Sequence, residues 1–215
     1  MLYRRPMTSG ETSTGLRERK KAGTRRALIE AALTLFERQG FDGTTVQQIA
    51  DEVQVARRTF NRYFTSKEDV VLAHEDQVME DLLAAIDGRP RGESPVTALR
   101  AVFQALLADP HWRRHELPRM QRVQLLLADN PALMGENMRR FAVREELLAH
   151  HLAERSSAGH CFHARLLAST AFAALRIAFQ EWAGSPDADP DSCARLVDEA
   201  LQRLDLGLDL PPLME

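Results

Sequence analysis

The sequence predicts an all-α protein of about nine helices, with a small N-terminal domain of three helices and a larger helical domain after it. Apolar residues recur at helical spacing in almost every segment, as in GTRRALIEAALTLFERQG near the N-terminus. No stretch keeps the alternation that is typical of a half-buried strand. Short clusters of Gly, Pro and polar residues separate the segments, and the clearest is DGRPRGESP at 87–95.

The small domain contains three helices of unequal length. The first carries a single apolar stripe and ends at Gly40, a residue typical of helix C-termini. Thr44 or Thr45 can cap the second helix, VQQIADEV, because a threonine hydroxyl accepts a hydrogen bond from a free amide of the first turn. After a very short connection comes ARRTFNRYF, in which Phe60 and Phe64 are expected to face inward.

The larger domain begins with a long helix that Ser66 can cap. Helical patterns cover residues 66–86, 95–108, 119–128, 131–155, 162–183 and 190–206. The predicted organisation is a flexible arm over 1–16, a small domain over 17–66, a larger helical domain over 67–207 and a tail over 208–215.

Composition and charge exclude several classes of protein. Of the 215 residues, 44% are hydrophobic, and no run reaches the ~18 apolar residues of a membrane span. We therefore expect no membrane partner. The absence of an apolar leader and the presence of only two cysteines indicate a reduced, cytoplasmic setting. Residues 1–72 hold 13 Lys or Arg against 9 Asp or Glu, whereas the rest of the chain is acidic. A polyanionic partner and a merely solvated basic tail explain this asymmetry equally well.

Two short helices joined by a very short turn describe a helix-turn-helix. Arginine can donate two hydrogen bonds to guanine and asparagine can pair with adenine in the same way, while Thr, Tyr and Lys contact phosphates. The alternative is a basic, solvated helix on a small helical domain. The candidate DNA-binding residues are Thr44, Thr45, Gln47, Arg57, Arg58, Thr59, Asn61, Arg62, Tyr63 and Lys67.

A set of fixed spacings across residues 22–72 makes this assignment more specific. The elements are Gly40-Phe41, Thr44-Thr45-Val46, Ile49-Ala50, Thr59-Phe60-Asn61-Arg62-Tyr63-Phe64 and Lys67-Glu68. Together they resemble the DNA-binding domain of TetR-family transcriptional regulators.

Three positions depart from that family pattern. Gln54 replaces the usual turn glycine, so a left-handed backbone there would be costly. Ala56 removes the side-chain cap of the recognition helix, which is worth ~1 kcal/mol. Asn61 replaces a common phosphate-binding tyrosine, which weakens one DNA-backbone contact or exchanges it for a base contact.

The resemblance implies that the larger domain binds an effector and forms a dimer, usually through a four-helix bundle made by the last two long helices. The segment PALMGENMRRFAVREELLAHHLAER also resembles the ligand domain of mycofactocin-associated regulators. The candidate interface residues are Leu167, Ala174, Ala178, Leu196, Leu201 and Leu204.

The candidate effector-binding residues are apolar and adaptable, and they favour a lipophilic or aromatic small molecule. They are Phe103, Met120, Met134, Met138, Phe141 and Phe172, with Phe179 as a further candidate. Arg139, Arg140 or Arg144 is available for a carboxylate or phosphate on the ligand. The alternative is a plain packed core with arginines in water.

The sequence therefore predicts a ligand-responsive transcriptional regulator, most simply a repressor that binds a pseudo-palindromic operator as a homodimer. The alternative is a helical DNA-binding or small-molecule-binding protein without an effector switch. No enzyme is expected, because the chain lacks GxSxG, Walker, GxGxxG and HExxH motifs. We expect no cofactor and no metal. The pair His111 and His115 lacks a third ligand, and the cluster of His160, Cys161 and His163 lacks a second ligand pair.

Overall fold

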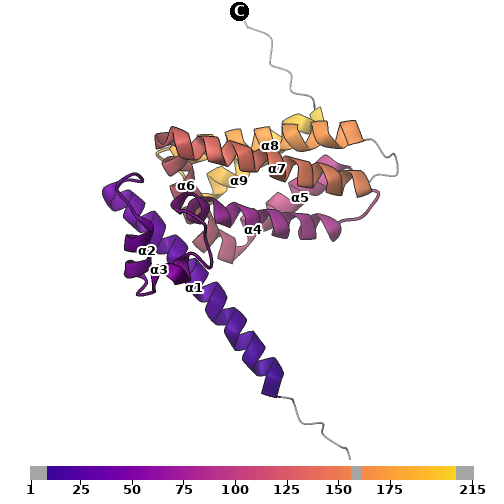
Figure 1. Cartoon of the computed structure of the whole chain (residues 1–215). Coiled ribbons are helices and arrows are strands. Elements are labelled where there is room, and N and C mark those ends of the chain that lie inside the picture. Colours follow the sequence, from indigo (N-terminus) through magenta and orange to yellow (C-terminus); the bar gives the residue numbers. More distant parts are fainter. Residues whose placement is uncertain (1–8, 156–160, 207–215) are drawn as a thin grey trace, which may run out of the picture. The chain divides into compact units, whose positions relative to one another are not determined.

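The computed structural model describes residues 9–155 and 161–206, and in this part of the chain it contains helices and no strand (Figure 1). The helices are α1 (Ser9–Gln39), α2 (Val46–Glu52), α3 (Arg57–Phe60), α4 (Lys67–Asp87), α5 (Pro95–Ala108), the π-helical turn η1 (Trp112–Glu116), α6 (Leu117–Asp129), α7 (Pro131–Arg155), α8 (Cys161–Gly184) and α9 (Pro190–Leu206). The all-α class and the expectation of about nine helices are confirmed.

The chain divides into two compact units between Val71 and Leu72, inside α4. The sequence placed this division five residues earlier, at the start of α4. Helix α1 begins at Ser9, so residues 9–16 of the predicted arm are helical. The predicted tail over 208–215 lies outside the described residues.

In the first unit, α1 ends where Gly40 adopts φ +80°, as its position in the sequence indicates. Thr45 caps α2 in a capping box: its side chain accepts from the Gln48 backbone N–H, and the Gln48 side chain accepts from the Thr45 N–H. Phe60 and Phe64 are buried together, with ring centroids 5.6 Å apart. The predicted inward face of the third helix is therefore confirmed.

Helix α3 is shorter than the segment ARRTFNRYF suggests. Its regular part ends at Phe60, and the chain continues in tighter turns in which Arg62 N donates to Thr59 O and Tyr63 N to Phe60 O. Ala56 provides no side-chain cap, as predicted. Without that cap, burial of the two phenylalanines is the main anchor of this short element.

The second unit is built around α8, which packs against α7, α9 and α6. Figure 1 shows α7 and α8 running side by side. Trp182 is buried in the core and donates from Nε1 to the Asp189 carbonyl, 2.9 Å away, which fixes the connection from α8 to α9. An ion pair between Arg100 and Asp198, 2.8 Å long, joins α5 to α9.

Residues 112–116 are helical, although the sequence predicted no helix between residues 108 and 119. Asp109 Oδ1 accepts from the backbone N–H groups of His111 and Trp112, which caps this turn. Pro118 is the second residue of α6, which follows the π-helical turn directly, and it has no N–H to donate to the carbonyls of that turn. None of the helices within 9–155 and 161–206 is both long enough and apolar enough to cross a bilayer.

Candidate functional site

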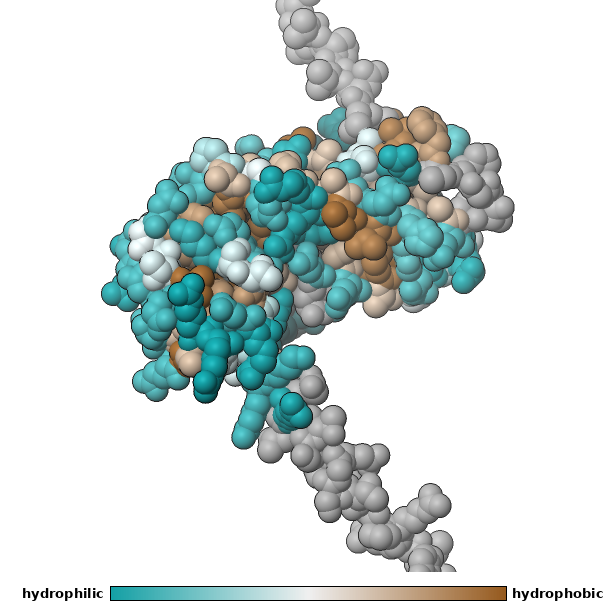
Figure 2. All heavy atoms as spheres, in the orientation of Figure 1, coloured by the Kyte–Doolittle hydropathy of each residue, from teal (hydrophilic) through white to brown (hydrophobic). Residues whose placement is uncertain are grey.

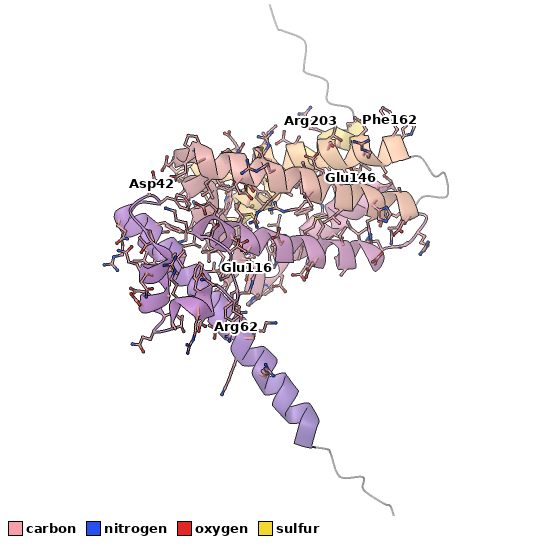
Figure 3. All side chains as sticks on the ribbon, in the orientation of Figure 1. Asp42, Arg62, Glu116, Glu146, Phe162 and Arg203 are labelled. Carbon is pink, nitrogen blue, oxygen red and sulfur yellow. The ribbon has the colours of Figure 1, made fainter. Side chains whose placement is uncertain are left out.

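The candidate DNA-reading surface consists of the polar residues of α3 and the turn after it. Arg57 and Arg58 are exposed in α3, and Asn61 and Arg62 are exposed just after it. Thr59 and Tyr63 are half-buried. The segment therefore presents three guanidinium groups and one amide to solvent, while its phenylalanines hold it to the unit. Figure 3 labels Arg62 in this part of the chain.

The turn before α3 has the strained backbone that the missing glycine implies. Gln54 has φ +56°, a left-handed conformation that costs a residue with a Cβ about 1–2 kcal/mol. Its N–H donates to Asp51 O, and the next N–H, of Val55, donates to Ala50 O, both at 2.9 Å. These bonds keep the four-residue connection between α2 and α3, residues 53–56, in a fixed geometry.

Arg62 and Tyr63 form a pair beside the exposed arginines. The Arg62 guanidinium lies 5.1 Å from the centroid of the Tyr63 ring, and its Nη2 donates to the tyrosine hydroxyl at 3.3 Å. Stacking of this kind holds an arginine in one orientation. Sequence reasoning missed Arg25, whose guanidinium carbon lies 5.4 Å from the centroid of the Phe64 ring.

The remaining predicted DNA contacts have roles inside the unit. Thr44 is 2% exposed, and its hydroxyl donates to Gly40 O. Gln47 is exposed and donates to Asp51. Lys67 Nζ donates to Phe41 O at 2.6 Å and lies 4.2 Å from the Phe41 ring centroid. Its second carbonyl partner is Thr44 O, at 3.3 Å. Since an ammonium has three donors, one of them remains for a phosphate.

A cavity of about 90 Å³ lies within the second unit. Its walls are mainly apolar, and helices α4, α5, α6, α7 and α8 all contribute. The lining residues are Val78, Met79, Leu82, Phe103, Met120, Gln124, Phe141, Arg144, Phe172, Leu175, Arg176 and Phe179. Four of the six predicted effector-binding residues are therefore brought together, as is Phe179.

The other two predicted effector residues lie elsewhere: Met134 is half-buried and Met138 is exposed, and neither lines this cavity. Of the three candidate arginines, only Arg144 lines it. Sequence reasoning missed Arg176 and Gln124. The signal for Arg176 was a single cation inside the apolar run FAALRIAF, in which Phe172, Leu175, Ala178 and Phe179 are buried.

Helix α8 has a second apolar stripe that points away from its own core. Phe162, Leu166 and Ile177 are 71%, 52% and 58% exposed. At about 100° per residue they lie within about 60° of one another around the helix axis. Buried residues such as Ala168 and Leu175 occupy the opposite side. Figure 2 shows hydrophobic side chains at the surface of the second unit, and Figure 3 shows Phe162 projecting from the first turn of α8.

The predicted interface residues divide into two groups. Leu167, Ala174, Leu196 and Leu204 are half-buried and retain surface. Ala178 and Leu201 are buried in the core of the chain itself, at 4% and 0% exposure, because they face the other helices of the same unit. This corrects the expectation that these two contact a partner. The exposed stripe on α8 was missed, although its spacing was visible in the sequence.

The histidine and cysteine candidates are described only in part. The rings of His111 and His115 lie 4.8 Å apart. Among the described residues, no three His, Cys, Asp or Glu side chains are grouped as a metal site requires. The cluster of His160, Cys161 and His163 lies partly outside the described residues. Cys193 is fully buried, and desolvation raises the pKa of its thiol to about 12.

Comparison with known proteins places both units in one family. Residues 28–74 match the family of bacterial regulatory proteins described as the tetR family, and residues 93–209 match the MftR C-terminal domain. The HTH-type transcriptional regulator TcmR of Streptomyces glaucescens is 35% identical over 92% of this chain and 94% of its own length. The chain belongs to the TetR family. It is a transcriptional regulator with a helix-turn-helix DNA-binding domain.

Solved structures agree with this fold. The fatty acid degradation regulator FadR of Bacillus halodurans aligns over 86% of this chain and 96% of its own, with a TM-score of 0.58 and 22% identity. NalD, described as the secondary repressor of the MexAB-OprM multidrug efflux pump in Pseudomonas aeruginosa, aligns over 85% of this chain and 96% of its own, with a TM-score of 0.57 and 22% identity. These relatives are transcriptional regulators rather than enzymes.

Proposed function

We propose that this TetR-family protein is a repressor that binds a pseudo-palindromic operator as a homodimer and is released by a small molecule. The observation that carries the DNA-binding part is the surface of α3 and the turn after it. Two buried phenylalanines anchor that segment, and Arg57, Arg58 and Asn61 are exposed on it. A short helix with such donors fits the major groove, where arginine recognises guanine and asparagine recognises adenine.

Dimerisation is needed because the DNA-contacting segment, α3 and the turn after it, is short. A segment of two turns contacts too few base pairs to select one genomic site, so two copies are needed. The exposed stripe of Phe162, Leu166 and Ile177 on α8 supports an interface there, together with the half-buried residues of α8 and α9. A two-fold axis through this face brings the stripe of one protomer against the same stripe of its partner.

The effector is assigned to the cavity of the second unit, where several apolar side chains and Arg144 converge. Helix α4 supplies three lining residues, Val78, Met79 and Leu82, and the same helix begins in the DNA-binding unit. A ligand that moves α4 changes the spacing of the two reading segments. A hundredfold preference for the altered state corresponds to about 2.7 kcal/mol of coupling.

The protein acts where the chromosome lies, in the cytoplasm.

Selection of binding sites from a pool of random DNA duplexes, followed by footprinting, tests this proposal. We expect an enriched sequence with two inverted half-sites and a protected region that covers both. An Arg58→Ala variant should lose about 1–3 kcal/mol of affinity and relax the base preference at one position in each half-site. Arg114→Ala removes the same charge from an exposed position in the second unit and serves as the control. Enrichment of no common sequence would contradict the proposal.

A further inference from the structure

The charged residues that line the cavity are all cationic. The lining contains two guanidinium groups, Arg144 and Arg176, and the neutral amide of Gln124, and none of the lining residues is acidic. Arg144 is only 5% exposed, and its guanidinium carbon lies 5.3 Å from the centroid of the Phe141 ring. Removing a cation from water in this way is costly unless an anion compensates for it. The lining therefore favours a ligand that carries a negative charge.

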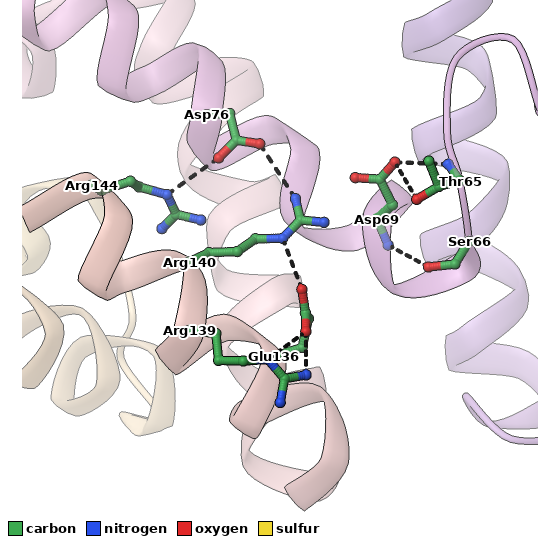
Figure 4. A network of polar contacts seen from close by, with 8 residues as sticks. All are labelled: Thr65, Ser66, Asp69, Asp76, Glu136, Arg139, Arg140 and Arg144. Carbon is green, nitrogen blue, oxygen red and sulfur yellow. Dashed lines mark hydrogen bonds and ion pairs between the residues drawn. The ribbon is translucent and has the colours of Figure 1, made fainter. Parts of the chain in front are cut away.

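One carboxylate that pairs with Arg144 comes from outside the lining. Asp76, on α4, accepts from Arg144 Nε through Oδ1 and from Arg140 Nη1 through Oδ2, both at 3.3 Å (Figure 4). Charge-assisted N–H···O bonds are typically about 2.7–2.9 Å long, so both contacts are long. The Asp76 side chain is 53% exposed, so solvent screens its attraction to the two arginines and weakens the ion pairs further. Asp76 is thus a partner that a better-placed anion can replace.

The other lining residues favour an aromatic group on the ligand. Phe103, Phe141, Phe172 and Phe179 all line the cavity, and the rings of Phe141 and Phe172 meet edge to face with centroids 5.6 Å apart. Such an arrangement favours another aromatic ring. The cavity of about 90 Å³ is smaller than the ~150 Å³ that holds benzene in a protein core, so a ligand must displace part of the wall. Met79 and Met120 are the side chains best able to adapt.

We propose that the cavity binds an aromatic carboxylate. Its ring lies among the phenylalanines, and its carboxylate replaces that of Asp76 as the partner of Arg144. This inference rests on the proposed function and gives its effector a chemical class. The exchange breaks one of the contacts between α4 and α7, so ligand binding weakens the attachment of α4 to α7. Asp76 is then a competitor of the ligand, and removing its charge should strengthen binding rather than weaken it.

The probes are 2-naphthoate, its neutral amide 2-naphthamide, and decanoate as an aliphatic anion. Affinities are measured by isothermal titration calorimetry on the full chain without DNA. We expect 2-naphthoate to bind more tightly than the other two compounds. Asp76→Asn should strengthen 2-naphthoate binding several-fold and leave 2-naphthamide binding unchanged, whereas Arg144→Met should abolish the preference for the anion. A merely structural role of Asp76 would not strengthen the binding of the anion alone.

Asp87→Asn is the matched control, because Asp87 also lies on α4 and pairs with α7, through His151 at 3.1 Å and Arg155 at 3.6 Å. It should not change the affinity for any probe. Equal binding of 2-naphthoate and 2-naphthamide, tighter binding of decanoate, no binding of 2-naphthoate, or equal effects of the two aspartate substitutions would overturn the inference. Operator release is measured separately by mobility shift. Binding with the expected pattern but without release would contradict the effector role in the proposed function and leave the site assignment intact.

Discussion

Ile177→Arg tests the proposed dimer at a position where the substitution does not disturb the core. Full burial of an isoleucine side chain is worth about 1.5–3 kcal/mol, and Ile177 is 58% exposed. Covering it therefore contributes about 1–1.5 kcal/mol per protomer, and twofold symmetry doubles this to about 2–3 kcal/mol. An arginine loses this contribution and places an unpaired charge in an apolar seam, at a further cost of about 1 kcal/mol or more. The dimer dissociation constant should rise more than a hundredfold.

Sedimentation velocity over a concentration series measures that constant, and thermal unfolding followed by circular dichroism checks the fold. Thr97→Arg introduces the same charge at an exposed position of α5 and should leave the dimer unchanged. If Ile177→Arg gave as much dimer as the unmodified chain at each concentration, the stripe on α8 would not be the interface.

Three further predictions concern stability and reactivity. Thr45→Ala removes the capping box of α2 and should lower the free energy of unfolding by about 1 kcal/mol in urea titration; an unchanged midpoint would contradict this. The Arg100 hydrogen bond holds the pKa of Asp198 below its usual value of 3.8, so this pair stabilises the fold above that pH and loses its effect as the pH falls. The difference in melting temperature between the unmodified chain and Asp198→Asn should therefore be present at pH 7 and shrink below pH 4, whereas a constant difference would contradict the assignment. Because burial raises the pKa of Cys193 to about 12, a Cys161→Ser chain should react with Ellman's reagent only on unfolding, and rapid reaction of the folded chain would show that Cys193 is accessible.

The sequence predicted correctly those features that depend on residues close together along the chain. The inward face of Phe60 and Phe64 follows from helical spacing, and the left-handed turn at Gln54 follows from a family pattern whose glycine is missing. Local chemistry fixes such features, so a single segment contains the information. The length of α3 was overestimated because periodicity does not distinguish an α-helix from the tighter turns that continue it.

Features that depend on distant segments were predicted only in part. Phenylalanines and methionines were correctly chosen as cavity residues, but their spacing could not separate Met120, which lines the cavity, from Met138, which is exposed. The contact between Asp76 and Arg144 joins residues 68 positions apart and was not foreseen. The buried position of Leu201 was missed for a related reason, since an amphipathic pattern does not say whether the apolar face meets the same chain or a partner.

The most direct test of the central claim is the salt dependence of operator binding by a chain in which Arg57, Arg58 and Arg62 are replaced by alanine. Each phosphate contact contributes about 0.9 to the slope of log K against log salt, and each base contact contributes about 1–3 kcal/mol. If these arginines hold the DNA, affinity at 0.15 M salt should fall at least a hundredfold, and the loss should divide between a shallower slope and weaker discrimination against a scrambled operator. Affinity within threefold of the unmodified chain, with the same slope, would contradict the account.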